Sequence, residues 1–356
     1  MKVAIAGAGP AGLAAAIFLA EAGAEVVVYE AFSVGENIVC AEGFFDFHGN
    51  LKLNLPFSMK INKIIVVDKE EFCVNLPSSS SFFTFERKTW QKNLKDTAAS
   101  KGATFVENHK LTKEDIIELS ENNDYVIDAT GIKAISHFLF PRKDVIKYRK
   151  GFMPTFQHVI SGDFSNYEGC IKAIILNNPA GYFWLFPKRL NGSLSIANAG
   201  LGYLAKNKKI PNLKNTLEKI LEKEGLSSCT VLTKKASPIP TNRIKTFMTG
   251  NIILTGDALG LCSPLHGGGI DSAYLSGIYA AKSIIHRDFS IYQRFLNQLS
   301  KRFFKERLIV KLWSLLGSTK VLMRLKDKGL FEDSPENIPF SNDWLKKAIL
   351  SMLFHF

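Results

Sequence analysis

Short apolar runs in the first thirty residues follow the order of a strand, a helix and a second strand. Lys2–Ala6 is a compact run of Val, Ile and Ala, which predicts a buried strand. Leu13–Ala22 is rich in Ala and Leu and predicts a helix that Gly23 closes. Glu25–Tyr29 is rich in Val and predicts a second strand. Together the three segments predict a βαβ unit.

The middle of the chain has a pattern typical of antiparallel strands. Residues 61–76 alternate in short runs of Ile, Val and Phe and predict a hairpin. Between about 150 and 200 further strand-like runs occur, among them Ala173–Leu176 and Tyr182–Phe186, and Asn191–Gly192 is typical of a hairpin turn. We therefore expect an antiparallel sheet in this region.

Buried strands and helices return towards the end of the chain. Tyr125–Ala129 and Asn251–Leu254 predict strands that join the first two in one parallel sheet. Predicted helices are Thr89–Lys101, Leu213–Glu224 and Ile270–Ile285, and the remainder to Phe356 is expected to be mostly helical. The order of these elements predicts a discontinuous α/β domain with an antiparallel domain inserted into it.

Composition places the chain among folded proteins with anionic partners. The 356 residues, 46% hydrophobic and 22% charged, suit two or three lobes. The net charge of +12 favours partners such as nucleotides or an anionic membrane surface. Between Arg287 and Lys328, 11 basic residues face 3 acidic ones, so this stretch carries +8. A solvated helix face and a membrane-surface patch both explain it.

The cysteines and the apolar runs bear on compartment. The 5 cysteines are odd in number and form no C-x-x-C pair, which argues against a disulfide framework, a zinc site or an iron–sulfur cluster. A reducing compartment follows, and we expect a cytoplasmic protein. No run reaches about 18 strongly apolar residues, so the protein is expected to be soluble or peripheral to a membrane.

The turn after the first strand carries a dinucleotide fingerprint. Gly7, Gly9 and Gly12 form G-x-G-x-x-G, in which the first allows a tight turn, the second a close approach of pyrophosphate and the third helix–strand packing. The pyrophosphate would sit at the helix N-terminus. Glu30 ends the second strand, where a carboxylate can accept both ribose hydroxyls. The alternative is a chance Gly-rich turn, which the ordered context disfavours.

A second glycine cluster near the end of the chain favours FAD over NAD. Gly256–Asp257–Ala258 follows the strand at Asn251–Leu254, and Gly267–Gly268–Gly269–Ile270 opens a helix. An acid at a strand end can bind sugar-like hydroxyls, and a helix N-terminus can face the electron-rich edge of a reduced flavin. Two such sites, far apart in the sequence, suit the two ends of one extended cofactor.

Four segments occur in order along the chain: GAGPAGLAAA from Gly7, CAEG from Cys40, GYFWLFPK from Gly181 and GDALGLCSPLHGGGIDSA from Gly256. With these segments the chain resembles the geranylgeranyl reductase family of FAD enzymes, which includes the archaeal digeranylgeranylglycerophospholipid reductases. FER at 85–87 and DATG at 128–131 fit the wider superfamily. The resemblance implies a Rossmann-like FAD-binding domain of the glutathione reductase and p-hydroxybenzoate hydroxylase type.

The same resemblance assigns domains and site residues. It implies an FAD-binding domain of residues 1–50, 82–135 and 240–285, a substrate-binding domain of residues 51–81 and 136–239, and a C-terminal helical region of residues 286–356. The implied cofactor-binding residues are Gly7, Gly9, Ala11, Gly12, Glu30, Arg87, Ala129, Gly131, Gly256, Asp257, Gly268, Gly269 and Ile270. The implied substrate-binding residues are Tyr182, Trp184, Phe186, Pro187, Lys188 and His266, with Cys40, Tyr182 and Trp184 catalytic.

The implied reaction is saturation of prenyl C=C bonds on a lipid, a quinone or a prenyl diphosphate. Aromatic faces at Tyr182 and Trp184 could stabilise a developing cation, although spacing alone also suits core aromatics. Cys40 could be catalytic or an inert thiol. The expected reductant is NAD(P)H or reduced ferredoxin, since one dinucleotide fingerprint is visible.

Other functions and partners remain open at this point. The main alternative function is a flavin monooxygenase of the aromatic hydroxylase type; an electron carrier to quinone and a non-catalytic lipid-binding protein are the others. The tail segments Leu308–Leu316 and Trp344–Phe356 predict helices that pack on the core or contact a membrane as a peripheral element. We expect no nucleic-acid partner.

Overall fold

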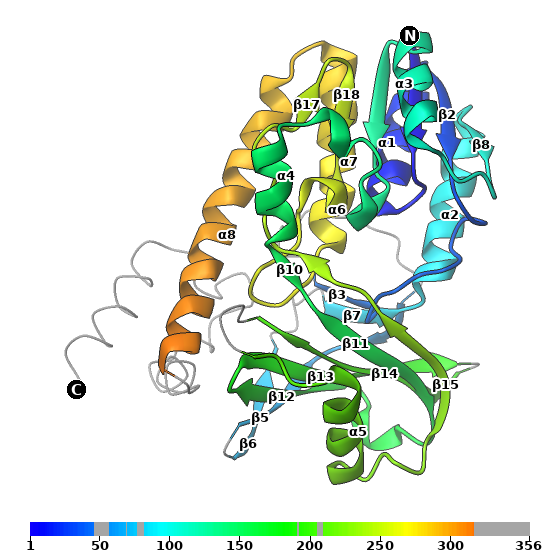
Figure 1. Cartoon of the computed structure of the whole chain (residues 1–356). Coiled ribbons are helices and arrows are strands. Elements are labelled where there is room, and N and C mark those ends of the chain that lie inside the picture. The colour runs from blue at the N-terminus through cyan, green and yellow to red at the C-terminus, as the bar shows by residue number, and fades with distance from the viewer. Residues whose placement is uncertain (46–56, 69, 77–81, 191, 205–208, 317–356) are drawn as a thin grey trace. The chain divides into compact units, whose positions relative to one another are not determined.

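The computed structural model describes residues 1–45, 57–68, 70–76, 82–190, 192–204 and 209–316 (Figure 1). The chain forms two compact units. The parallel unit comprises Met1–Ile38, Arg87–Phe152 and Pro238–Lys301. The antiparallel unit comprises Val39–Glu86, Met153–Ser237 and Arg302–Phe356. Each unit is therefore assembled from three separate stretches of the sequence.

A six-stranded sheet in the order β17-β18-β9-β1-β2-β8 forms the centre of the parallel unit. Its strands are β1 (Lys2–Ala6), β2 (Glu25–Tyr29), β8 (Thr104–Val106), β9 (Tyr125–Asp128), β17 (Met248–Thr249) and β18 (Ile252–Leu254). All neighbours are parallel except the β17–β18 pair. The apolar runs of β1 and β18 are buried because helices cover a parallel sheet on both faces. The predicted βαβ unit and the two later strands are confirmed.

The helices of this unit are α1 (Pro10–Glu21), α2 (Arg87–Ser100), α3 (Lys113–Asn122), α4 (Arg142–Arg149), α6 (Gly256–Leu259) and α7 (Ile270–His286), with the 3-10 turns η1 (Gly131–Lys133) and η2 (His137–Leu139). Three of them, α1, α2 and α7, are those the sequence predicts, and α3, α4 and α6 were not predicted. α1 begins at Pro10, earlier than predicted, because Pro is favoured in the first helical turn. α7 packs closely on α1, since a Cβ at Gly277 would lie 2.0 Å from the Ala11 carbonyl oxygen.

Two sheets form the antiparallel unit. The larger has the order β15-β11-β14-β13-β12-β5-β6 and the smaller the order β3-β7-β4. The strands are β3 (Gly43–Phe45), β4 (Phe57–Lys60), β5 (Lys63–Val67), β6 (Glu71–Asn75), β7 (Phe82–Phe85), β11 (Thr155–Ser161), β12 (Cys170–Asn177), β13 (Ala180–Leu190), β14 (Ser193–Tyr203) and β15 (Thr230–Ala236). The predicted hairpin of residues 61–76 is β5–β6. β13 and β14 pair up to Leu190 and Ser193, around the predicted turn, whose Asn191 lies outside the described residues.

Alternation along β13 separates two faces of the larger sheet. Phe183 and Leu185 are buried in the cluster that also contains Leu217 and Leu221 of α5 (Leu213–Lys223). α5 lies along this face (Figure 1). Because successive side chains of a strand point to opposite faces, Tyr182, Trp184, Phe186 and Lys188 lie on the other face. The period-two pattern thus places four of the six predicted substrate residues on one face, whereas Pro187 points to the opposite face and His266 belongs to the parallel unit.

The compact units differ from the predicted domain ranges at several places, and the predicted C-terminal region is divided between the two units after Lys301. Residues 136–152 belong to the parallel unit, because the ring Nε2 of His137 lies 2.7 Å from the Ala258 carbonyl oxygen and Tyr148 donates to the Asp257 carbonyl. Residues 39–45 and 82–86 belong to the antiparallel unit, where β3 pairs with β7. The helix α8 (Ser290–Leu316) confirms a helix after residue 286. The predicted helix Trp344–Phe356 lies outside the described residues.

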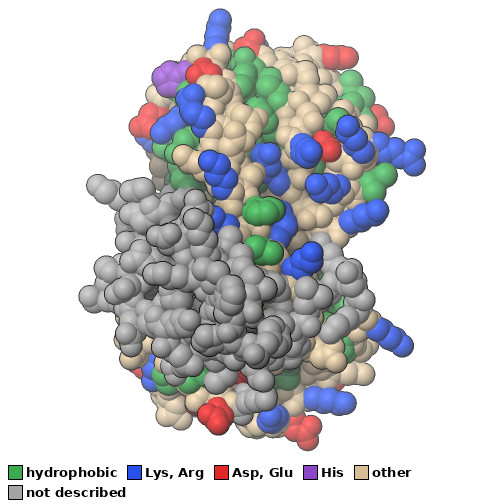
Figure 2. Space-filling model, turned by 90° about the vertical axis from the view of Figure 1, so that its left-hand side faces the viewer, with side chains coloured by type: hydrophobic (Ala, Val, Ile, Leu, Met, Phe, Trp, Pro, Cys, Tyr) green, Lys and Arg blue, Asp and Glu red, His purple; other side chains and the backbone are tan. Residues whose placement is uncertain are grey.

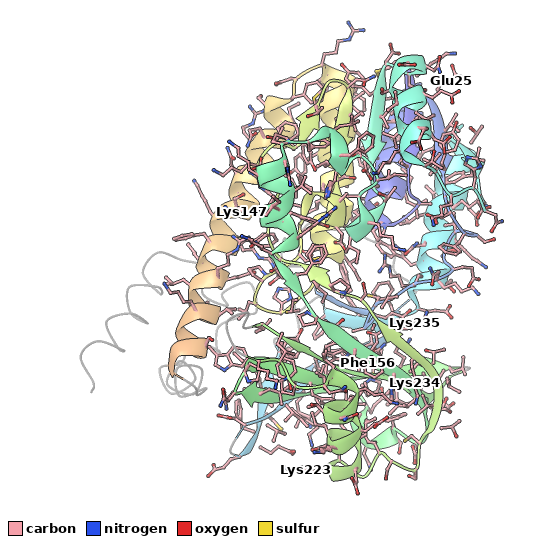
Figure 3. The ribbon with its side chains drawn as sticks, viewed as in Figure 1. Glu25, Lys147, Phe156, Lys223, Lys234 and Lys235 are labelled. Carbon is pink, nitrogen blue, oxygen red and sulfur yellow. The ribbon has the colours of Figure 1, made fainter. Side chains whose placement is uncertain are left out.

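The edge strand β15 carries lysines beside a buried histidine. Figure 3 shows Lys234 and Lys235 on this strand, where charge discourages pairing with another chain. His158 of β11 lies opposite Lys234 in the register. Its ring is buried, and neither ring nitrogen has a hydrogen-bond partner among the described residues. Burial, with the charge of Lys234, lowers the pKa of His158, while Glu218 opposes and Lys214 adds to the shift.

We expect His158→Leu to stabilise the protein, and more so in acid. Below about pH 6.5 the unfolded chain binds a proton that the folded chain resists, so the parent loses stability as pH falls. Leucine removes both that loss and two buried nitrogens without partners. Thermal unfolding of the parent and of His158→Leu at about pH 8 and about pH 5 measures the gain in stability at each pH. A gain that does not increase at the lower pH would contradict the pH argument.

Candidate active site

The first glycine turn follows β1 and is shaped by its neighbours. Gly7 has φ +97° and donates to the Tyr29 carbonyl at 2.7 Å. A Cβ at Gly7 would lie 2.5 Å from the Ala129 oxygen, and one at Gly12 1.9 Å from the Gly7 oxygen. Around Gly9, by contrast, no atom lies within 4 Å of the Cβ position. Folding thus requires the first and third glycines, and the second leaves open space where a phosphate can approach.

α1 presents an uncapped N-terminus to this space. Gly9 is its N-cap and gives no side-chain cap, and Pro10 follows in the first turn. The first N–H groups of a helix have no acceptor within the helix, and the helix dipole favours an anion there. Ala11 is buried in this turn, close to the Cβ position of Gly256. The arrangement fits the pyrophosphate of a dinucleotide.

Glu30 follows β2 and is held by the backbone. Its Oε2 accepts from the Ala8 N–H at 2.8 Å and its Oε1 from the Phe32 N–H at 3.1 Å. Each carboxylate oxygen has a second lone pair, so both remain able to accept a ribose hydroxyl. The predicted adenosine-side acid therefore lies beside the turn, already oriented.

Arg87 reaches the same turn through a residue that the sequence analysis did not predict. The guanidinium Nε of Arg87 donates to Gln91 Oε1 at 2.7 Å, and Gln91 Nε2 donates to the Ala8 carbonyl at 3.2 Å. The two side chains are four residues apart on α2, a spacing that places them on one helix face. That spacing is the signal that could have identified Gln91.

The loop after β9 closes the other side of the turn. Ala129 donates to the Ala6 carbonyl at 2.8 Å, and Gly131 has φ +73° as it enters η1. The buried carboxylate of Asp128 accepts from the N–H and the hydroxyl of both Thr130 and Ser136, at 2.5–2.9 Å. Asp128 was not among the predicted site residues, yet it fixes the position of Ala129 and Gly131.

Asp257 lies in α6, directly after β18. Burial raises the pKa of its carboxyl group, while the hydrogen bond from Cys262 and the charge of Arg87 oppose the shift. The Cys262 thiol donates to Asp257 Oδ1 at 3.0 Å. Cys262 therefore orients this carboxylate. Gly256 donates to the Ser276 hydroxyl at 2.9 Å, which joins α6 to α7.

The second glycine turn ends at the N-terminus of α7. Gly268 donates to the His266 Nδ1 at 3.1 Å, so this histidine shapes the turn. Gly269 is the N-cap without a side-chain cap, and Ile270 is the first helical residue. A Cβ at Gly269 would lie 2.6 Å from the Cys262 sulfur. The N–H groups of this turn fit the electron-rich edge of a flavin. The substrate role predicted for His266 stays a prediction.

A second group of predicted residues gathers on β13 of the antiparallel unit. The Trp184 indole lies across the backbone of Gly200, where a Cβ would be 2.4 Å from the ring, and it donates to Asn198 Oδ1 at 2.8 Å. The Tyr182 and Trp184 ring centroids lie 5.8 Å apart. Burial raises the pKa of the Tyr182 hydroxyl. Glycine at position 200 thus gives the indole its place.

The segment from Cys40 to Gly43 lies on the same face of the sheet. Glu42 has φ +61°, forms an ion pair with Lys188, and directs its N–H at the Cys40 sulfur, 3.3 Å away. A Cβ at Gly43 would lie 2.5 Å from the Phe186 ring. Cys40, Trp184, Phe186 and Lys188 are therefore brought together. Lys188, predicted to bind substrate, has its charge matched by a carboxylate of the protein.

Pro187 anchors the neighbouring sheet. Its carbonyl accepts from the Thr84 hydroxyl of β7 at 2.8 Å.

The carbonyl of Cys40 accepts from the side-chain amides of Gln157 and Asn198, each at 3.1 Å. Neither amide was predicted as a site residue, because their contact with Cys40 depends on strand register and not on local sequence.

Known proteins resemble this chain in sequence and fold. Residues 2–59 match the family model described as an FAD binding domain. Digeranylgeranylglycerophospholipid reductases of Methanocaldococcus jannaschii and Thermoplasma acidophilum are 28% and 27% identical, over 92% and 86% of this chain and 88% and 85% of theirs. The crystal structure of a geranylgeranyl bacteriochlorophyll reductase-like protein from Thermoplasma acidophilum has a TM-score of 0.77 at 21% identity, with 98% of this chain and 95% of that chain covered.

The fold and the two glycine turns define an FAD-binding flavoprotein, an FAD-dependent oxidoreductase. Among flavoproteins, the chain is similar to the geranylgeranyl reductase family over most of its length, as the four sequence segments predict. A flavin-dependent brominase shares the fold with a TM-score of 0.68 at 15% identity, covering 99% of both chains. None of the helices in the described ranges is both long and apolar enough to cross a bilayer.

Proposed function

We propose that this chain is an FAD-dependent reductase that saturates C=C bonds of prenyl chains. One observation carries the proposal: the Cys40–Gly43 segment is fixed on the aromatic face of β13, so a thiol, an indole and a phenol lie together in one unit of a flavoprotein. The relatives named as digeranylgeranylglycerophospholipid reductases support the same reaction class.

The residues fit the chemistry of an unactivated alkene. Reduction needs a proton at one carbon and a hydride at the other; FAD, when bound and reduced, supplies the hydride. The positive charge that develops on the alkene is stabilised by the π-faces of Tyr182 and Trp184. Burial raises the pKa of the Tyr182 hydroxyl, so the phenol stays neutral. Cys40 positions the alkene or supplies the proton.

The substrate is a prenyl lipid, a quinone or a prenyl diphosphate, and the reductant is NAD(P)H or reduced ferredoxin. Because Lys188 is paired with Glu42, we assign its charge to holding the Cys40 segment and not to a head group. A hydrocarbon chain requires no such charge, so the aromatic face suits the prenyl part of the substrate.

A peripheral contact with an anionic membrane belongs to the same proposal, for a cytoplasmic enzyme. On α8, Phe304 is 67% exposed and lies between Lys301 and Lys305 in the sequence. An apolar side chain flanked by cations is typical of interfacial helices. Lys and Arg side chains are spread over the described surface seen in Figure 2, with hydrophobic side chains among them.

Co-expression with a pathway that makes prenyl lipids tests the function. We expect mass spectrometry to show lipids that have gained the mass of H₂ for each saturated bond, in whole steps. Cys40→Ser should retain FAD, seen by its yellow absorbance, and lose most of the product. Unchanged lipids from a flavin-loaded parent would refute the reductase, and substrate-dependent oxygen consumption with a hydroxylated product would favour the monooxygenase.

A further inference from the structure

Two amide side chains hold the backbone of Cys40. The Cys40 carbonyl accepts from Gln157 Nε2 and from Asn198 Nδ2, each at 3.1 Å. Gln157 is 5% exposed and Asn198 0% exposed, so both amides have left water to make these bonds. A carbonyl oxygen has two lone pairs, and the two donors occupy both. The position of residue 40 is therefore fixed through its main chain, independently of its thiol.

Trp184 extends the same chain of hydrogen bonds. Its indole N–H donates to Asn198 Oδ1 at 2.8 Å, so Asn198 accepts from the aromatic residue and donates to the cysteine segment. Gly200 allows this arrangement, because a Cβ there would lie 2.4 Å from the indole and 2.7 Å from the Gln157 Cβ. Buried polar groups that are all paired give one defined geometry. The indole and the cysteine backbone therefore cannot shift independently.

We propose that Gln157, Asn198 and Trp184 form a clamp that sets the position of the Cys40 thiol against the aromatic face during turnover. The role of the thiol in turnover rests on the proposed function. The clamp itself rests only on the hydrogen bonds that hold Cys40. Gln157 and Asn198 are positioning residues in this scheme, since they act on the main chain of Cys40. The Glu42–Lys188 ion pair anchors the other end of the segment.

Replacing the two amides by carboxylates of nearly equal shape separates the clamp from packing. Asn198→Asp keeps the acceptor for Trp184 but places an oxygen against the Cys40 carbonyl. Gln157→Glu also places an oxygen against this carbonyl, from β11. Trp184→Phe removes the indole N–H and keeps an aromatic ring, which provides a variant without a new charge. Gln293→Glu is the matched control, because Gln293 is an exposed amide of α8 that donates to Asn297 at 2.7 Å.

The first readout is the rate at which iodoacetamide alkylates Cys40, followed by peptide mass spectrometry. Cys73 is exposed and serves as the internal reference. In Asn198→Asp and Gln157→Glu we expect Cys40 to react roughly tenfold faster while Cys73 is unchanged, because loss of a buried hydrogen bond frees the segment. The flavin absorbance and the Gln293→Glu control should match the parent.

The second readout is turnover on the prenyl lipid. We expect kcat to fall roughly tenfold with a smaller change in KM, and Trp184→Phe to fall in the same direction. Unchanged alkylation of Cys40 in all three variants overturns the clamp. Faster alkylation with unchanged kcat overturns its role in turnover. A parent that never reduces prenyl lipids refutes the proposed function instead, while the alkylation rates still decide whether the clamp exists.

Discussion

Gly9→Ala is expected to give a folded protein that has lost its FAD, whereas Gly12→Ala is expected to give little folded protein. At Gly12 the new Cβ would lie 1.9 Å from the Gly7 oxygen, so α1 could no longer pack against the turn that follows β1. We expect a cost of about 3 kcal/mol or more. At Gly9 the Cβ meets no protein atom within 4 Å, and the backbone there has φ −75°, which alanine adopts readily.

The open space at Gly9 is the space that the pyrophosphate would occupy. A methyl group there should weaken FAD binding roughly a hundredfold, or about 2.7 kcal/mol. The ratio of flavin absorbance to protein measures occupancy, and thermal unfolding of flavin-free protein measures the fold. Gly9→Ala with the parent's flavin content would show that phosphate does not bind at this turn, whatever Gly12→Ala does.

Local sequence predicted the parallel unit well because its signals are local. The turn from Gly7 to Gly12, the acid at Glu30 and the glycines before Ile270 each lie within one strand–turn–helix element. The steric requirements of such an element are met by residues that lie close together in the sequence. The role of Asp128 was not predicted in this way. Its carboxylate accepts from residues of the following turn, and in the sequence it resembles any acid at the end of a strand.

The antiparallel unit shows where sequence reasoning ends. Once Tyr182–Phe186 is recognised as part of a strand, alternation puts Tyr182, Trp184 and Phe186 on one face. It does not indicate that Gln157 and Asn198 meet there, because their meeting depends on the register between strands distant in sequence. Glu42 and Lys188 are 146 residues apart, so their pairing was equally inaccessible. Lys188 was therefore assigned to the substrate, although a carboxylate of the protein matches it.

Glu42→Gln and Lys188→Met are each expected to destabilise the protein more than the double variant does. The two side chains are 13% and 12% exposed, so either charge left alone is largely shielded from water. We expect about 2 kcal/mol for each single change, below the range for fully buried pairs, and partial recovery in the double variant. Urea unfolding of the four proteins gives the coupling energy.

The neighbouring pair of Arg189 and Glu168 is the matched control. It lies at the end of the same strand but is 37% and 58% exposed, so Arg189→Met and Glu168→Gln should cost less than about 1 kcal/mol and show little coupling. Additive effects at Glu42 and Lys188 would mean that the ion pair contributes no more than a surface pair. Strong coupling would instead show that the charge of Lys188 holds the Cys40 segment on β13, which leaves the aromatic face free for an uncharged chain.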